Sequence, residues 1–290
     1  VKRFTDSYVV IDGGTLGTTC ARVGCMPSKV MIQTAEDYHH RHDLAVEGIE
    51  GGEQLALEAP RAMEYVRQMR DSFVEHVMGG PVSKLGDKLI RSHARFRAPG
   101  VIEVDGGTVH AKRVIVATGS KPVVPQAWQA FGDRVITTDR VFEQPSLPKS
   151  MAVLGLGVIG LELGQALARL GVEVTGVDML ERVGGLSDDT VNETAVQAMR
   201  RELPVWLGEK ADLSEGAQGR VRVCAGDKSV EVEQVLVAAG RAPNVDGLGL
   251  DQLGLELDGR GVPAYDPETM KVPGAPIFIA GDANAELPLQ

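Results

Sequence analysis

The chain has 290 residues, of which 43% are hydrophobic, and this suits one large or two medium globular domains. Forty acidic and thirty basic residues give a formal charge of -10, and no run rich in Lys and Arg suggests a nucleic-acid surface. The apolar runs are shorter than the roughly 20 residues that cross a bilayer, and the N-terminus lacks the layout of a signal peptide. We therefore expect an intracellular, cytoplasmic protein without nucleic-acid or membrane partners.

Strand and helix patterns alternate along the chain. In chain order they predict a strand at 7–12, helices at 27–44 and 60–78, strands at 89–96, 101–104 and 113–118, a strand at 150–156, a helix at 158–170, a strand at 172–178, a helix near 188–202, and strands near 219–225, 229–232 and 234–239. This alternation is typical of an α/β fold with a mostly parallel sheet covered by helices. The stretch QPSLPKS at 144–150 is interpreted as a linker. VIVATGS at 114–120 is echoed by VLVAAGR at 235–241, which indicates two similar nucleotide-binding halves.

The segment GLGVIG at 155–160 follows a predicted strand and opens a predicted helix, as a dinucleotide-binding turn requires. Gly155 permits the tight turn, Gly157 lets the backbone approach a pyrophosphate, and Gly160 lets helix and strand pack closely. The next strand ends at Asp178, whose carboxylate would bind a ribose 2′-hydroxyl and repel a 2′-phosphate. The segment predicts a site for NAD. A plain tight turn is the alternative, and the nearby Arg182 keeps NADP open.

Cys20 and Cys25 frame the segment CARVGC, in a chain with three cysteines. Pro27 suits the first turn of a helix that would start near Met26, which places Cys25 at a helix N-terminus. There the helix dipole, with Lys29 one turn further on, would favour the thiolate. In an intracellular protein, such a pair is more typical of a redox centre than of a structural disulfide.

Two other interpretations of this pair stay open. A zinc site would need about four ligands, and neither Cys224 nor the histidines offer a second pair at metal spacing. His39, His40 and His42 fit a solvated helix end better. The two cysteines could also be reduced, buried small residues, as Cys224 is expected to be within a predicted strand.

Five segments in order resemble the flavoprotein disulfide reductases, the family that includes dihydrolipoamide dehydrogenase, glutathione reductase and mercuric reductase. They are TTCARVGCMPSK at 18–29, ATGSKP at 117–122, GLGVIGLELG at 155–164, AAGRAPN at 238–244 and IFIAGDAN at 277–284. The resemblance covers nearly the whole chain. It implies two Rossmann-like domains with parallel sheets: an incomplete FAD-binding domain at 1–145, an NAD-binding domain at 146–262, and a return to the FAD-binding domain at 263–290.

The resemblance also implies roles for single residues. Cys25 would be the thiol nearest the flavin and Cys20 the thiol that exchanges with substrate. Lys29 and Glu162 would form an ion pair beside the flavin. The residues implied for FAD are Asp12, Gly13, Lys29, Ala94, Gly119 and Asp282. Those implied for NAD are Gly155, Gly157, Gly160, Asp178 and Gly240. As alternatives, Asp12 or Asp282 could cap a loop, and Glu162 could be an acid in the first turn of a helix.

The sequence also departs from the family pattern. No GxGxxG precedes Asp12, and the segment that would carry a His-Glu acid/base pair and the dimer interface does not follow Asp282. We therefore expect a fragment of a longer, homodimeric protein, and we expect the fragment by itself to be inactive. PSK at 27–29 and Asp178 favour a dihydrolipoamide dehydrogenase that passes electrons from dihydrolipoyl groups through Cys20, Cys25 and FAD to NAD⁺, with a 2-oxoacid dehydrogenase complex as a candidate partner. A mercuric, glutathione-type or other disulfide reductase is the alternative within the family, and a non-catalytic nucleotide-binding module is the alternative outside it.

Overall fold

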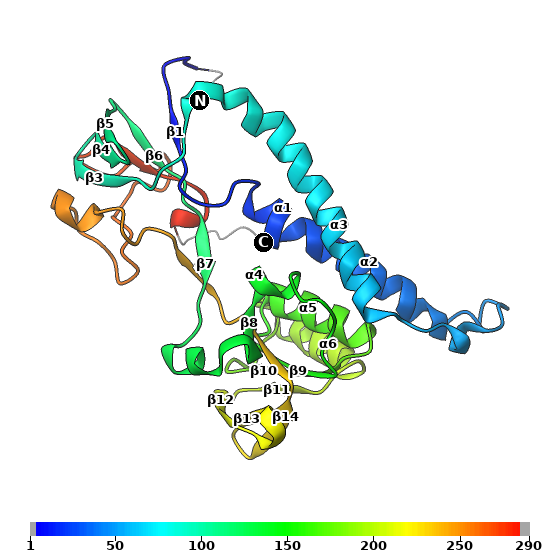
Figure 1. Cartoon of the computed structure of the whole chain (residues 1–290). Helices are drawn as coiled ribbons and strands as arrows, with labels where there is room; N and C mark the ends of the chain where they lie inside the picture. The colour runs from blue at the N-terminus through cyan, green and yellow to red at the C-terminus, as the bar shows by residue number, and fades with distance from the viewer. Residues whose placement is uncertain (1–3, 285–290) are drawn as a thin grey trace. The chain divides into compact units, whose positions relative to one another are not determined.

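The computed structural model describes residues 4–284 as an α/β protein with two compact units. Among the described residues, the first unit combines 4–17, 76–121 and 241–284, and the second combines 18–75 and 122–240. Each unit is therefore built from separate stretches of the chain (Figure 1). None of the helices within residues 4–284 is long and apolar enough to cross a membrane.

A five-stranded parallel sheet forms the centre of the second unit. Its strand order is β11-β10-β9-β15-β8, so the central strand β9 pairs with β10 on one side and with β15 on the other. This arrangement is the one expected for a dinucleotide-binding fold. The strands are β8 (Val135–Thr137), β9 (Ser150–Leu154), β10 (Glu173–Asp178), β11 (Val205–Leu207) and β15 (Gln234–Val237).

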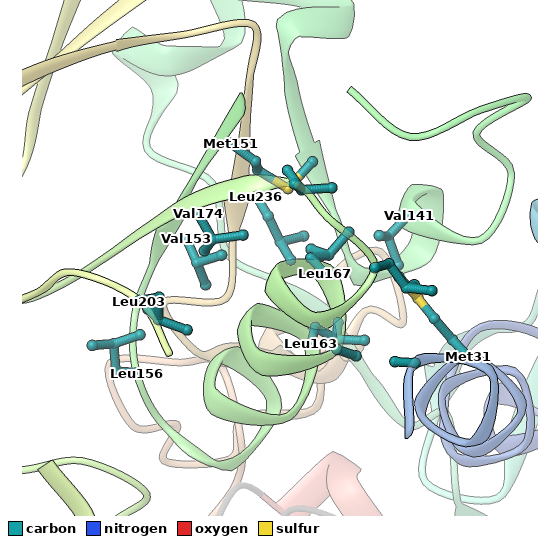
Figure 2. Close-up of a cluster of buried hydrophobic side chains, with 14 of the residues drawn as sticks. Met31, Val141, Met151, Val153, Leu156, Leu163, Leu167, Val174, Leu203 and Leu236 are labelled. Carbon is teal, nitrogen blue, oxygen red and sulfur yellow. The ribbon is translucent and has the colours of Figure 1, made fainter. Parts of the chain in front are cut away.

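Helices cover this sheet because their apolar faces bury against it. The helices of the unit are α1 (Thr19–Val23), α2 (Cys25–His39), most of α3 (Ala59–Val77), α4 (Thr138–Val141), α5 (Val158–Arg169) and α6 (Asp189–Arg200). The core joins α2 to α5 and the sheet: Met31 lies among Val141, Leu163 and Leu167 (Figure 2). A separate antiparallel sheet consists of β12 (Asp212–Glu215), β13 (Val221–Ala225) and β14 (Lys228–Val232).

Short strands build the first unit around its own core, which includes Phe96, Ile102, Ile277 and Ile279. Its antiparallel sheet consists of β3 (Arg95–Ala98), β4 (Val101–Val104) and β5 (Gly107–His110). The paired strands are β1 (Val10–Ile11) with β2 (Leu89–Ile90), β6 (Val114–Val116) with β17 (Ile277–Ile279), and β7 (Ser120–Pro122) with β16 (Arg241–Pro243). The β1/β2 and β6/β17 pairs are parallel.

The structure corrects several expected boundaries. The strand expected at 7–12 is reduced to β1, since only residues 10 and 11 pair with β2, although Asp12 N–H still donates to Ile90. The helix expected at 27–44 ends at His39 and continues as a short 3₁₀ turn. The stretch 144–150 lies inside the second unit, between α4 and β9, so it is not a linker between the two units.

Candidate functional site

The segment that contains Cys20 and Cys25 is two helices joined at one glycine. Thr18 caps α1, because its Oγ1 accepts the N–H of Ala21 at 3.1 Å. Gly24 ends α1 and precedes α2, and a Cβ at this position would lie 3.0 Å from the carbonyl oxygen of Thr19. A glycine therefore lets the start of α2 pack closely against the start of α1.

This packing brings the two cysteines together in the second unit. Cys20 lies on α1, Cys25 is the first residue of α2, and both are free thiols whose side chains hydrogen-bond to each other. Burial raises the pKa of the Cys20 thiol, and its hydrogen bond with Cys25 raises it further. The backbone N–H groups of Cys25 and Met26 donate to Cys20 and lower this pKa, but burial and the thiol contact prevail.

Lys29 and Glu162 form the expected ion pair, with Nζ and Oε2 2.8 Å apart. Lys29 lies on α2 and Glu162 on α5, so the pair joins the helix that begins at Cys25 to the helix that follows the glycine-rich turn. Glu162 lies beyond the first turn of α5, which removes the alternative of a first-turn helix acid. Lys29 belongs to the second unit, as do both cysteines.

The glycine-rich turn leads from β9 into α5. Gly155 has φ of 95°, and a Cβ there would lie 2.5 Å from the carbonyl oxygen of Ala238. A Cβ on Gly160 would lie only 1.8 Å from the carbonyl oxygen of Gly155. A Cβ on Gly157 would have no atom within 4 Å, so this position borders open space. Gly157 precedes the first turn of α5, where backbone N–H groups have no partner within the helix. The turn is therefore able to hold an anionic group.

Asp178 lies at the end of β10, beside this turn. Its Oδ2 accepts the N–H of Leu156 at 2.6 Å, and its Oδ1 accepts the N–H of Leu180 at 2.8 Å. Arg182, the residue that kept NADP open, instead donates to the carbonyl oxygen of Ser187 at 3.0 Å and pairs with Asp189. The structure thus directs Arg182 toward its own loop.

Asp282 has a partner from another motif in the first unit. Strands β6 and β17 are parallel neighbours, so the segments that follow them meet at one edge. Ser120 Oγ donates to Oδ2 of Asp282 at 2.9 Å. Arg241 Nε donates to the same Ser120 Oγ at 2.8 Å, and its Nη2 donates to the Ser120 carbonyl oxygen at 2.8 Å. Three separate sequence motifs therefore meet at Ser120.

Asp12 is held at the end of β1 by its own loop and by Arg91. Its Oδ1 accepts the N–H of Gly14 at 2.8 Å, as in a loop cap, and lies 3.5 Å from Arg91 Nη1. Arg91 also donates to the carbonyl oxygens of Asp12 and Gly14. These contacts use Oδ1, so the loop-cap interpretation and a binding role for Oδ2 are compatible. Gly13 packs against His93, where a Cβ would lie 2.7 Å from the ring.

The remaining expected residues lie at strand ends. Ala94 is partly buried against the core of the first unit, just before β3. The carbonyl oxygen of Gly119 accepts the N–H of Asn244 at 2.8 Å, and that of Gly240 accepts the N–H of Val123 at 3.0 Å. Cys224 is half-buried on β13. Among residues 4–284, no group of three or more His, Cys, Asp or Glu side chains could hold a metal ion.

The structure thus divides the expected site residues between the units. Asp12, Gly13, Ala94, Gly119 and Asp282 lie in the first unit. The second unit contains Cys20, Cys25, Lys29, Glu162, Gly155, Gly157, Gly160, Asp178 and Gly240. Sequence reasoning missed the roles of Ser120, Arg241 and Arg91 as partners of these residues. Ser120 and Arg241 belong to the quoted motifs ATGSKP and AAGRAPN, which was the available signal; nothing in the sequence singled out Arg91.

Comparison with known proteins places this arrangement in context. Residues 2–289 match the family described as pyridine nucleotide-disulphide oxidoreductase. The chain is 34% identical over 266 residues to a dihydrolipoyl dehydrogenase of Thermus scotoductus, with 87% of this chain and 56% of that protein covered. It is 35% identical over 293 residues to the enzyme of that name from Manduca sexta, with 92% and 56% covered. The chain therefore spans little more than half the length of these relatives.

Solved structures show the same fold. The chain is similar to the crystal structure of LpdA from Mycobacterium tuberculosis with a TM-score of 0.83 and 25% identity, covering 97% of this chain and 63% of that one. It is similar in fold to the HOCl-induced flavoprotein disulfide reductase RclA of Escherichia coli, with a TM-score of 0.80, 20% identity, and 97% and 61% covered. These matches agree with the parallel sheet and glycine-rich turn described above.

Proposed function

Because the chain belongs to the pyridine nucleotide-disulphide oxidoreductase family, we propose that it carries the redox-active cysteine pair of an FAD-dependent dihydrolipoyl dehydrogenase. This family consists of oxidoreductases that use FAD and a nicotinamide dinucleotide. The observation that carries the proposal is the contact between Cys20 and Cys25 at the start of α2, beside the Lys29–Glu162 ion pair. Relatives named for the dihydrolipoyl substrate support the choice of substrate.

The cysteines would act by thiol–disulfide exchange. In their oxidised form, a substrate thiolate attacks the sulfur of Cys20, forms a mixed disulfide and releases Cys25 as the thiolate. The second substrate thiol then attacks the mixed disulfide, which completes the substrate disulfide and frees Cys20. Two electrons thus move from the substrate to the pair, which is left reduced. The amides of Cys25 and Met26 would stabilise negative charge on Cys20 as it leaves.

The described residues fit both dinucleotides. For NAD, Gly157 borders open space at the start of α5, where a pyrophosphate would meet free N–H groups. For FAD, Asp12 keeps Oδ2 for a ribose hydroxyl, and Ser120 orients Asp282 for a hydroxyl of the ribityl chain. When bound, FAD supplies the carrier that takes electrons from the dithiol and passes a hydride to NAD⁺. The assignment of FAD to residues 1–145 and 263–290 and of NAD to residues 146–262 belongs to this proposal.

NAD is favoured over NADP by two contacts. Asp178 puts a carboxylate beside the turn, where it would repel a 2′-phosphate, and Arg182 is engaged by Asp189 and the Ser187 carbonyl oxygen. A homodimer, a 2-oxoacid dehydrogenase complex as partner and a cytoplasmic location stay predictions that rest on the proposed enzyme class.

The test is NAD⁺ reduction by dihydrolipoamide in the FAD-loaded protein. We expect Cys20→Ser and Cys25→Ser each to abolish the reaction, because either leaves one thiol without its partner. Cys224→Ser, on β13, is the matched control and should keep it. Activity that survives in Cys20→Ser would refute the proposed exchange. Turnover with glutathione disulfide or Hg²⁺ instead would favour another reductase of the family, and NADH binding without any disulfide exchange would favour a non-catalytic module.

A further inference from the structure

Two ion pairs join α2 and α5 at equivalent positions. Lys29 pairs with Glu162 near the start of the two helices, and Glu36 pairs with Arg169 near their ends. Residues 29 and 36 are seven apart, and so are residues 162 and 169, which corresponds to a rise of about 10.5 Å on each helix. The two helices therefore run parallel and in register, two turns apart at the two pairs.

Apolar packing fills the space between the pairs. Met31 and Ala35 of α2 belong to the same buried cluster as Leu163 and Leu167 of α5. Figure 2 shows Met31, Leu163 and Leu167 of this cluster. Such close-packed contacts hold the helices together and resist sliding, because displaced side chains lose their van der Waals partners. The directional contacts at each end add to this packing in fixing the register.

The two ion pairs differ in the exposure of their cations and in the number of hydrogen bonds that the cations make. Lys29 is 63% exposed, so its pair with Glu162 is screened by water. Arg169 is 17% exposed and donates Nε to one oxygen of Glu202 at 2.6 Å and Nη2 to the other at 2.7 Å. Gln165 donates to Glu202 as well, at 2.7 Å. This bidentate geometry fixes the guanidinium, which then presents Nη1 to Glu36.

The contact between Arg169 and Glu36 offsets an unfavourable position of the Glu36 carboxylate. Glu36 lies in the last turn of α2, where the negative end of the helix dipole disfavours a carboxylate. The Arg169 guanidinium offsets that cost only if α2 stays at its present height along α5. A slide of α2 would separate the carboxylate from its cation.

We propose that Glu36 and Arg169 are positioning residues for the cysteine pair. The role rests on the proposed function, since it concerns the same two thiols. Helix α2 is continuous from Cys25 to His39, so the anchor at Glu36 also fixes its first turn. Cys25 is the first residue of that turn, and Cys20 lies on α1, which packs against α2. The height of α2 along α5 therefore sets the position of the Cys25 thiol relative to Cys20.

The reactivity of the two thiols tests this role without FAD, NAD or substrate. In the fully reduced protein under anaerobic conditions, iodoacetamide labelling with peptide mass analysis gives separate rates for Cys20 and Cys25 across pH. We expect Glu36→Gln to change the ratio of these rates by about threefold, the scale that the loss of one partly exposed ion pair supports. The equilibrium of the pair with the glutathione couple should move by a similar factor. Arg169→Lys, which keeps the charge but cannot hold both carboxylates, should act in the same direction.

Asp37→Asn is the matched control, because it makes the equivalent change on the next residue. Asp37 is exposed, and within residues 4–284 the only hydrogen-bond partner of its side chain is Gln33 of its own helix, at 2.8 Å. It should leave both measurements unchanged. Wild-type rates and equilibrium in a folded Glu36→Gln protein would overturn the positioning role. Failure of the wild-type pair to form any disulfide would count against the proposed function, while the labelling ratio still decides the role of Glu36.

Discussion

The carboxylate of Asp178 holds the backbone of Leu156, in the middle of the glycine-rich turn, through a hydrogen bond of 2.6 Å to its N–H. Its second oxygen binds the N–H of Leu180. One side chain thus ties the end of β10 to the turn that follows β9. The residue expected to select the cofactor also shapes the loop that would bind it.

Asp178→Asn is expected to narrow the preference for NADH over NADPH. The amide keeps the size of the side chain and one acceptor oxygen, but it removes the charge that would repel a 2′-phosphate. We expect the ratio of the two dissociation constants to shrink about tenfold, as for the loss of a charged hydrogen-bond partner. Fluorescence titration with both nucleotides measures it, with Glu181→Gln as the charge-matched control. Tighter binding of NADPH by the wild-type protein would contradict the role of Asp178.

Gly157→Ala should weaken NADH binding, whereas Gly160→Ala should reduce stability. A Cβ on Gly157 meets no atom within 4 Å, so this variant should fold with an unchanged melting temperature yet bind NADH at least about tenfold more weakly, because the methyl group would occupy the space for the pyrophosphate. A Cβ on Gly160 would lie 1.8 Å from the Gly155 carbonyl oxygen, so that variant should lose stability first. Thermal melts and NADH titration separate the two effects. Normal NADH binding by Gly157→Ala would place the pyrophosphate elsewhere.

Ser120→Ala should weaken FAD binding by about tenfold, since Asp282 would lose a hydrogen bond that fixes its orientation. Flavin retained after gel filtration and the quenching of flavin fluorescence measure the effect. Ser120→Thr retains the hydroxyl and should bind FAD nearly as well as the wild-type protein. Equal loss of flavin in both variants would mean that crowding at β7, rather than the hydroxyl, controls binding.

The sequence predicted the second unit better than the first. GLGVIG, Asp178 and the helix after them are local patterns with a steric cause, and β9, α5 and β10 lie where they were expected. The ion pair of Lys29 with Glu162 joins residues more than a hundred positions apart, and only the family resemblance indicated it. The two-residue strands β1 and β2 carry too little apolar pattern to define their ends.

Long-range contacts account for what the sequence could not indicate. The hydrogen bond from Ser120 to Asp282 depends on the pairing of β6 with β17, which lie more than 160 residues apart. The division of each unit among separate stretches likewise depends on strand order, which residue spacing does not encode. The proximity of Cys20 to Cys25 arises from the junction of α1 and α2 at Gly24, whereas the position of Cys25 at a helix start was visible in Pro27.

The stabilising contribution of Glu202 should be lost in acid. Its hydrogen bonds with Arg169 lower the pKa of the Glu202 carboxyl, an effect that burial only partly opposes. A carboxyl whose pKa is depressed on folding contributes stability above its unfolded value, about 4.3, and this contribution is lost as pH falls through the lower folded value. At pH 7, Glu202→Gln should therefore reduce the free energy of unfolding by about 1 to 2 kcal/mol, and the difference should disappear as the pH falls below the folded pKa of Glu202. Urea unfolding across pH measures both curves, with Glu193→Gln on the exposed side of α6 as the control. A difference that stays constant down to the lowest pH would show that Glu202 acts through its shape rather than its charge.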